Sequence, residues 1–261
     1  MKHRTISVNV DPTNPGQFFA CCGLLELANR LWPDAEGWFE DGEFHIASAG
    51  TLNEMIHSIS HTELIQLDVE NNTSSPIQIA FPFNLRLDWW LDDRAGGREL
   101  KVWAGTMESV RIARAMQHAM RKPEFQSDGL FDIGVIAYDP ENIEKKVEPF
   151  YFDARRGPNA HSRDVGFAPN DLHLTTTAFP AVEFLCLVGL QRTRPVRFQP
   201  RIFDYYTWRQ PLQPELITAA VAGLLSHASL HGYRFENWYR TGQKKHKAFL
   251  SATPISLRGD E

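Results

Sequence analysis

The most informative stretch of the chain is Val10-Asp-Pro-Thr-Asn-Pro-Gly-Gln-Phe-Phe-Ala-Cys-Cys-Gly-Leu-Leu-Glu-Leu-Ala-Asn-Arg-Leu-Trp32, in which turn residues run directly into a strongly apolar helix. Asparagine can cap a helix, proline fixes φ in its first turn, and glycine permits an unusual backbone, so Asn14-Pro15-Gly16 predicts a helix start. From Phe18 onward the apolar residues fall at helical spacing. The clearly polar positions are only Gln17, Glu26, Asn29 and Arg30. We therefore expect this helix to be covered on nearly all sides, by its own domain or by a partner.

The rest of the chain mixes short strands and helices without internal repeats. Alternating or apolar runs predict strands at 5–10, at 38–47 around a turn at 40–42, and at 86–90, 131–138, 151–152, 201–208, 233–239 and 248–252. Helical spacing predicts helices at 18–32, 52–59, 106–121, 182–190 and 214–227. Regular strand–helix alternation is missing, which predicts an α+β fold with a mixed, mainly antiparallel sheet and several packed helices. We expect residues 1–261 to form one compact subunit, or two lobes divided near 71–76 or 139–148.

Composition is that of a globular protein with a real core. The chain has 261 residues, 43% of them hydrophobic, which suffices for one large domain or two small ones. No apolar run approaches the roughly 20 residues of a membrane span, and the first residues lack the apolar stretch of a signal peptide. We expect a cytoplasmic protein that does not contact membranes. Cys21, Cys22 and Cys186 are expected to be small buried hydrophobic residues.

Charge is distributed unevenly along the chain. Residues 1–100 hold 6 Lys and Arg against 15 Asp and Glu, whereas residues 101–261 hold 21 against 17. Local fields matter more than the total of -5 for attracting a polyanion. We predict nucleic-acid contacts from three basic clusters: Arg111, Arg114 and Arg121 on one helix, Arg192, Arg194, Arg197 and Arg201 in one loop, and Lys244, Lys245 and Lys247 near a hairpin tip.

Aromatic residues accompany the second of these clusters. Pro195 and Pro200 prevent a regular helix there, so spaced arginines are free to meet successive phosphates. Stacking surfaces are expected from Phe198, Tyr205, Tyr206 and Trp208. The same rings would equally suit a protein core.

Motifs of enzyme chemistry are absent from the sequence. It contains no nucleophile elbow, phosphate loop, dinucleotide fingerprint, paired Cys-Xaa-Xaa-Cys or His-Glu-Xaa-Xaa-His. His57 and His61 have metal-ligand spacing but no third ligand in view, and His227 with His231 precede Gly232. Asp88, Asp92 and Asp93 would suit a divalent ion, although Arg94 and two tryptophans favour a strand edge. We predict no catalytic residues, no metal and no cofactor.

Four stretches that together span most of the chain carry a family resemblance. They are Asn14-Pro-Gly-Gln-Phe-Phe-Ala-Cys-Cys-Gly-Leu-Leu-Glu-Leu-Ala28, then Leu87-Asp-Trp-Trp-Leu91 with Leu100-Lys-Val-Trp-Ala-Gly-Thr106, then Phe152-Asp-Ala-Arg-Arg156 with Val165-Gly-Phe167, and Pro180-Ala-Val-Glu-Phe-Leu-Cys-Leu-Val-Gly-Leu-Gln-Arg-Thr-Arg-Pro195. In this order they resemble the small Csb/Csx-type proteins of type I-U CRISPR-Cas systems, also called type I-G. The resemblance implies an effector-complex subunit that helps a guide RNA interrogate DNA, and it assigns no active residue.

The expected function is therefore that of a non-catalytic subunit of a Cascade-like effector complex in antiviral defence. Its expected partners are the other effector subunits, guide RNA or target DNA, and the helicase-nuclease. Two alternatives stay open. One is a metal-dependent nuclease that uses Asp88, Asp92 and the histidines, and the other is a protein–protein adaptor whose acidic first hundred residues face basic neighbours.

Overall fold

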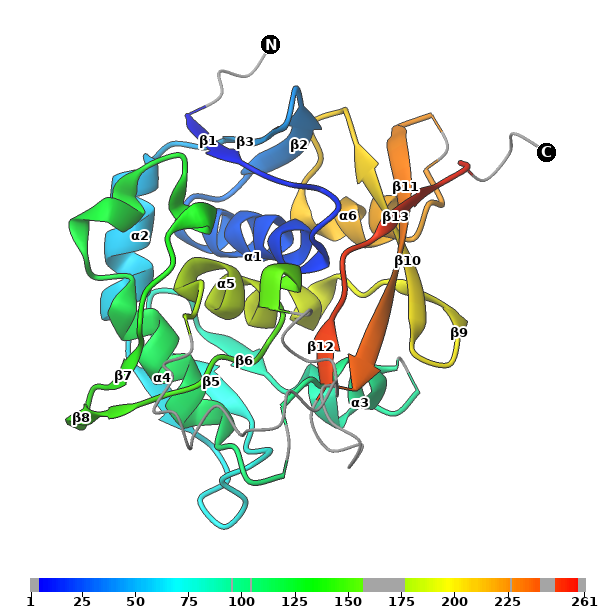
Figure 1. The fold of residues 1–261 in the computed structure, drawn as a ribbon. Coiled ribbons are helices and arrows are strands. Elements are labelled where there is room, and N and C mark those ends of the chain that lie inside the picture. Colours follow the sequence, from blue (N-terminus) through cyan, green and yellow to red (C-terminus); the bar gives the residue numbers. More distant parts are fainter. Residues whose placement is uncertain are drawn as a thin grey trace.

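Two apolar helices cross at the centre of the molecule (Figure 1). They are α1 (Pro15–Leu31) and α5 (Pro180–Arg192). The computed structural model describes residues 5–94, 96–103, 105–156, 177–225, 227–239 and 247–257. At the crossing, a Cβ atom on Gly23 would lie 2.0 Å from the carbonyl oxygen of Leu185, and one on Gly189 would lie 1.9 Å from that of Phe19. The two backbones are thus in direct contact, which only glycine permits.

The first half of the chain builds two small sheets beside these helices. The first has the order β1-β3-β2, and the second has the order β4-β5-β6. All of their strand pairs are antiparallel. Their bounds are β1 Ile6–Asn9, β2 Glu36–Glu40, β3 Glu43–Ala47, β4 Leu64–Gln66, β5 Ile77–Ile79 and β6 Leu85–Leu87.

The second half builds a larger sheet with the order β12-β11-β10-β9, in which β13 also pairs with β11. Its strand pairs are antiparallel too, as is the separate β7–β8 hairpin. The α+β fold with mainly antiparallel sheet is therefore confirmed. The bounds are β7 Tyr138–Asp139, β8 Asn142–Lys146, β9 Val196–Gln199, β10 Ile202–Trp208, β11 Ser229–Tyr239, β12 Lys247–Phe249 and β13 Thr253–Ile255.

Shorter helices fill the periphery. They are α2 Leu52–His61, α3 Gly97–Leu100, α4 Ser109–Ala119 and α6 Pro214–Val221, with 3-10 turns at Trp89–Leu91, Pro123–Gln126, Leu130–Asp132 and Ala154–Arg156. Within the described ranges, no helix has the length and apolar character needed to cross a bilayer. The largest cluster of buried apolar side chains extends from Ile6 to Ala252. It includes residues from all three parts of the chain that the expected lobe boundaries at 71–76 and 139–148 would separate.

Several predicted elements differ in the structure. The strand expected at 131–138 is mostly irregular: it starts in the 3-10 turn Leu130–Asp132, which buries Leu130 and Phe131, and then forms only an isolated bridge between Val135 and Ala178 before β7 begins at Tyr138. Tyr151 has a φ of 78°, which a strand cannot accommodate. The helix expected at 214–227 stops at Val221, because Gly223 takes a left-handed conformation and caps it.

Candidate nucleic-acid interface

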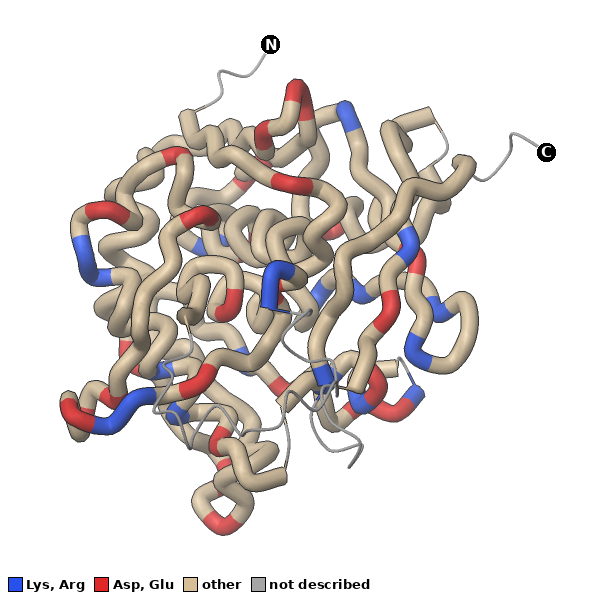
Figure 2. Tube along the Cα trace, viewed as in Figure 1, with Lys and Arg blue, Asp and Glu red and all other residues tan. Residues whose placement is uncertain are grey.

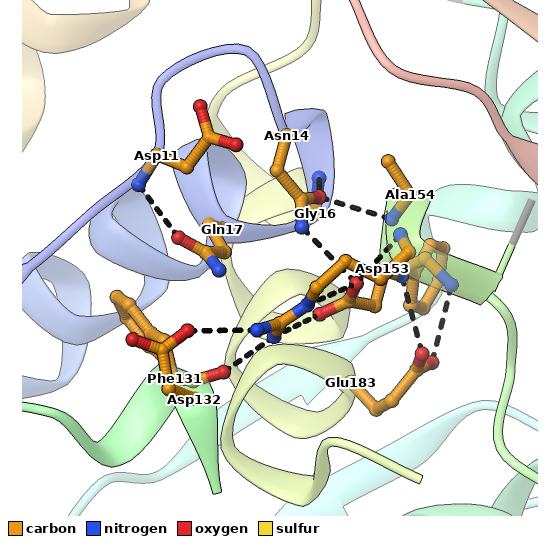
Figure 3. A network of polar contacts seen from close by, with 11 residues as sticks. Asp11, Asn14, Gly16, Gln17, Phe131, Asp132, Asp153, Ala154 and Glu183 are labelled. Carbon is orange, nitrogen blue, oxygen red and sulfur yellow. Dashed lines mark hydrogen bonds and ion pairs between the residues drawn. The ribbon is translucent and has the colours of Figure 1, made fainter. Parts of the chain in front are cut away.

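A buried polar network joins the start of α1 to the segment before α5 (Figure 3). The side-chain oxygen of Asn14 accepts from the N–H groups of Gly16 (3.1 Å) and Ala154 (3.0 Å), and its amide nitrogen donates to Asp153 (3.1 Å). Arg155 donates to both carboxylate oxygens of the fully buried Asp153, at 3.0 and 2.7 Å. One capping residue therefore serves two chain segments that are 139 residues apart.

Glu183 completes this network from the first turn of α5. Its carboxyl group accepts from the N–H groups of Tyr151 (3.0 Å), Phe152 (3.2 Å) and Asp153 (3.2 Å). Burial raises the pKa of Glu183 to about 8, and the charge of Asp153 adds to this rise against the lowering effect of the three N–H donors. We call Asn14, Asp153, Arg155 and Glu183 the 151–156 brace.

The brace has the characteristics of a structural element. Its hydrogen bonds join α1, α5 and residues 151–156 to one another. Two surface hollows of about 440 and 460 Å³ are lined by other residues. A Cβ on Gly16 would lie 2.4 Å from the carbonyl oxygen of Phe152, so the two segments also touch through their backbones. The brace thus fixes how 151–156 lies against α1 and α5.

Of the arginines predicted on one helix, Arg111 and Arg114 lie on α4, whereas Arg121 lies just after its end, and each contacts its own chain. Arg111 pairs with Asp139 at 2.7 Å, and Arg114 pairs with Glu141 at 3.1 Å and donates to the carbonyl oxygen of Leu64. Arg121 donates to the carbonyl oxygen of Ser60 at 2.9 Å. These arginines therefore tie α4 to the β7–β8 hairpin, β4 and α2. Arg111 and Arg114 also line the 440 Å³ hollow, together with three acidic residues.

The predicted basic loop at 192–201 is instead largely a β-hairpin, because β9 pairs with β10. Pro195 and Pro200 flank β9 and leave its four residues free to pair. Arg192 and Arg194 form ion pairs with carboxylates of other elements. Arg192 binds Glu26 of α1, and Arg194 binds Asp92 at 2.7 Å. Both are anchors between distant parts of the chain.

Arg197 in β9 and Arg201 in the turn before β10 keep more surface. Arg197 is 54% exposed and contacts Glu99 at 2.9 Å, and Arg201 lies 3.9 Å from Glu236. Figure 2 shows basic and acidic positions interspersed around the β9–β10 hairpin. A guanidinium has five N–H donors, so one carboxylate contact leaves donors for another anion.

The alternation along β11 creates an outer face of the larger sheet. Tyr233, Phe235 and Asn237 are buried, and the rings of Tyr233 and Phe235 stack on those of Tyr205 and Phe203. The intervening residues Arg234, Glu236 and Trp238 face outward, and the guanidinium of Arg234 lies 3.3 Å from the ring centroid of Phe198. Trp238, which is 36% exposed, lies below the guanidinium of Arg201, at 5.2 Å. We call Phe198, Arg201, Arg234 and Trp238 the arginine–aromatic face. Arg197 pairs in register with Phe203 and points to the other side of the sheet, toward Glu99 of α3.

Most of the rings expected to stack on bases are buried in the core. Tyr205, Tyr206 and Trp208 are buried in β10, because that strand has both faces covered over most of its length. Phe198 is 50% exposed, and its role as a stacking surface stays a prediction. Arg234 and Trp238 were missed, although the predicted strand at 233–239 already places alternate residues on opposite faces.

Lys247 begins β12 next to this face. Its ammonium group donates to the carbonyl oxygens of Arg98 (3.3 Å) and Glu99 (2.9 Å). Burial lowers the pKa of Lys247 to about 8, and the charges of Lys101 and Arg201 lower it further against the opposing effect of Glu99. Positive charge is therefore concentrated where β12 meets α3. Lys244 and Lys245 lie outside the described residues.

The carboxylates considered for a nuclease are engaged with cations or amides. Asp88 binds Arg86 at 2.8 Å and Gln191 at 3.1 Å, and Asp93 binds Arg98 at 3.1 Å. His57 and His61 stack on α2, whereas His231 lies in β11. In the part of the chain that the structure describes, no group of three or more His, Cys, Asp or Glu residues could hold a metal ion. Cys21, Cys22 and Cys186 are buried thiols, as expected.

Comparison with known proteins assigns the chain to no family. No protein-family model matches the chain, and neither a curated protein nor a solved structure does.

Proposed function

We propose that the chain is a non-catalytic, nucleic-acid-binding subunit of a CRISPR effector assembly of the type I-U/I-G kind, with the arginine–aromatic face as its contact to the phosphate backbone. The sequence resemblance supports the assembly, and the geometry of the face supports the contact surface. The proposed partners are guide RNA or target DNA, the other effector subunits and the helicase-nuclease.

The observation that carries the proposal is the gathering of four basic side chains on one sheet, with Arg201 and Arg234 on its outer face and Arg197 and Lys247 on the side next to α3. Residues 191–250 contain 10 Lys and Arg against 3 Asp and Glu, which gives this stretch a net charge of +7 in a chain of net charge -5. Such local excess attracts a polyanion even when the whole molecule is acidic. The exposed guanidinium of Arg197 and the loosely paired one of Arg201 have the donors that phosphate requires.

The salt dependence of binding tests this proposal. Fluorescence anisotropy of the full chain, alone and in its purified complex, is measured with labelled DNA and RNA over a series of salt concentrations. Each lost phosphate contact lowers the magnitude of the salt slope by about one unit and weakens all sequences alike. Arg197→Ala with Arg201→Ala should therefore lower the slope by about two.

Arg86→Ala is the matched control, because Arg86 is 59% exposed and ion-paired but lies on β6. It should retain the wild-type slope. Wild-type affinity and slope in the double variant, with an intact complex, would contradict the proposal and favour an adaptor that contacts only protein.

A further inference from the structure

We infer that the arginine–aromatic face binds single-stranded nucleic acid by stacking unpaired bases on Phe198 and Trp238. The inference deepens the proposed function and rests on it. Phosphate contacts alone do not distinguish a duplex from a single strand, whereas exposed rings do, because base faces are accessible only where bases are unstacked.

The first stacking position is the ring of Phe198. Arg234 lies over one side of this ring at 3.3 Å, and its guanidinium is itself fixed by two hydrogen bonds to Asp204, of 2.7 and 2.8 Å. The ring is therefore backed by a rigid planar cation while half of its surface stays in solvent. A held ring loses little conformational freedom when a base stacks on it.

The second position is the indole of Trp238, which follows the same design. The guanidinium of Arg201 lies 5.2 Å from the Trp238 ring centroid and 4.9 Å from that of Tyr239. Arg201 has a φ of 66°, which lifts it out of the strand path and over these rings. Trp238 and Phe198 are the large apolar residues of this sheet with substantial exposure among the described residues.

The distance between the two ring–guanidinium pairs suits two positions along one nucleic-acid strand. Arg234 and Trp238 lie on the same face of β11, four residues apart, which corresponds to roughly 13 Å along a strand. The two ring–guanidinium pairs are thus separate platforms on one surface, each with a guanidinium next to its ring. A nucleic-acid strand that follows this face would meet alternating cations and rings, the combination typical of single-strand binding surfaces.

The experiment compares a 12-nucleotide poly(dT), a 12-nucleotide poly(U) and a 12-base-pair duplex, each labelled, in anisotropy titrations with the full chain. We expect wild type to bind both single strands more tightly than the duplex. Phe198→Ala and Trp238→Ala should each weaken single-strand binding about tenfold and leave duplex binding within about twofold. Phe198→Tyr and Trp238→Phe keep a ring and should retain binding.

Tyr138→Ala is the matched control, because Tyr138 is a ring of similar exposure (38%) on β7, outside the larger sheet. It should bind as wild type does. If either alanine variant unfolds, Phe198→Leu and Trp238→Leu keep the apolar bulk and remove only the aromatic face, and the same tenfold loss is expected.

Three contrary outcomes are distinguishable. Equal binding of single strands by wild type and the ring variants overturns the stacking inference, and the proposed function survives if Arg197→Ala with Arg201→Ala still weakens binding. Loss of binding to single strands and duplex in equal measure also overturns it. No binding to any of the three probes, alone or in the complex, overturns the proposed function itself.

Discussion

Glu183 has an unusual environment for an acidic side chain. Three backbone N–H groups point at its carboxyl group, and Asp153 lies close enough to oppose its ionisation. The hydrogen bonds favour the charged form, but burial and the neighbouring carboxylate prevail and raise the pKa to about 8. The folded protein therefore binds this proton over a pH range in which the unfolded chain has already released it.

The stability of the protein should consequently depend on this proton. The contribution of Glu183 is fully present below its ordinary pKa of 4.5 and is lost as the pH rises toward 8. Denaturant unfolding between pH 5 and 8 should show a falling free energy of unfolding, with at most about 1.4 kcal/mol per pH unit from this group. Glu183→Gln cannot ionise and should flatten that slope. An identical slope in both proteins would contradict the assigned direction.

Gly23 and Gly189 should tolerate no side chain. Alanine ordinarily favours a helix over glycine by about 1 kcal/mol, but here its Cβ would overlap a carbonyl oxygen of the other helix. We expect Gly23→Ala and Gly189→Ala each to lower the free energy of unfolding by about 3 kcal/mol or more, since the helices must move apart. Gly129→Ala, where a Cβ would meet nothing within 4 Å, provides the control. Denaturant unfolding measures all three, and similar stabilities would argue against the backbone contact.

At the scale of elements, α1 is a buried helix held by its own domain. Leu25 has no exposed surface. Leu25→Ala should therefore reduce the free energy of unfolding by about 2 to 5 kcal/mol. Thermal and denaturant unfolding measure this, with Leu224→Ala on the exposed turn after α6 as a near-neutral control. Unchanged stability with lost complex assembly would instead make this helix a partner-binding surface.

The sequence predicts elements well where one physical signal dominates. Asn14 and Pro15 with the following apolar run predict α1, and the alternation at 233–239 predicts β11. Two prolines dominate the local pattern at 192–201 and predict a loop, whereas pairing with β10 makes Val196–Gln199 a strand. Likewise, apolar residues at 131–138 look like a strand until tertiary packing buries them in a turn.

The candidate site was predictable in position but not in detail. Clusters of arginine are visible in the sequence, whereas the carboxylates that bind them come from far away, as Glu26 does for Arg192 across 166 residues. Arg234 and Phe198 belong to strands whose register no local pattern sets. Which arginines form internal ion pairs and which stay exposed could therefore be seen only in the three-dimensional structure.

On the scale of the whole molecule, we predict that the full chain does not cleave nucleic acid. Incubation with single- and double-stranded DNA and RNA in Mg²⁺ or Mn²⁺ should leave the substrates intact, because Asp88, Asp92 and Asp93 are already bound to arginines. Reproducible cleavage that chelation stops and that Asp88→Ala or Asp92→Ala abolishes would replace the binding-subunit proposal with the nuclease alternative.

The crossing of α1 and α5 also determines when the protein can begin to fold. During synthesis α1 emerges early, but the helix that covers it follows about 150 residues later, so its apolar surface must wait for most of the chain to leave the ribosome. Contacts between residues so far apart in the sequence slow folding and prolong the lifetime of aggregation-prone intermediates with exposed apolar surface. Newly made chains of this protein should therefore depend on chaperones, or on rapid completion of translation, more than proteins whose first helix packs against its immediate neighbours.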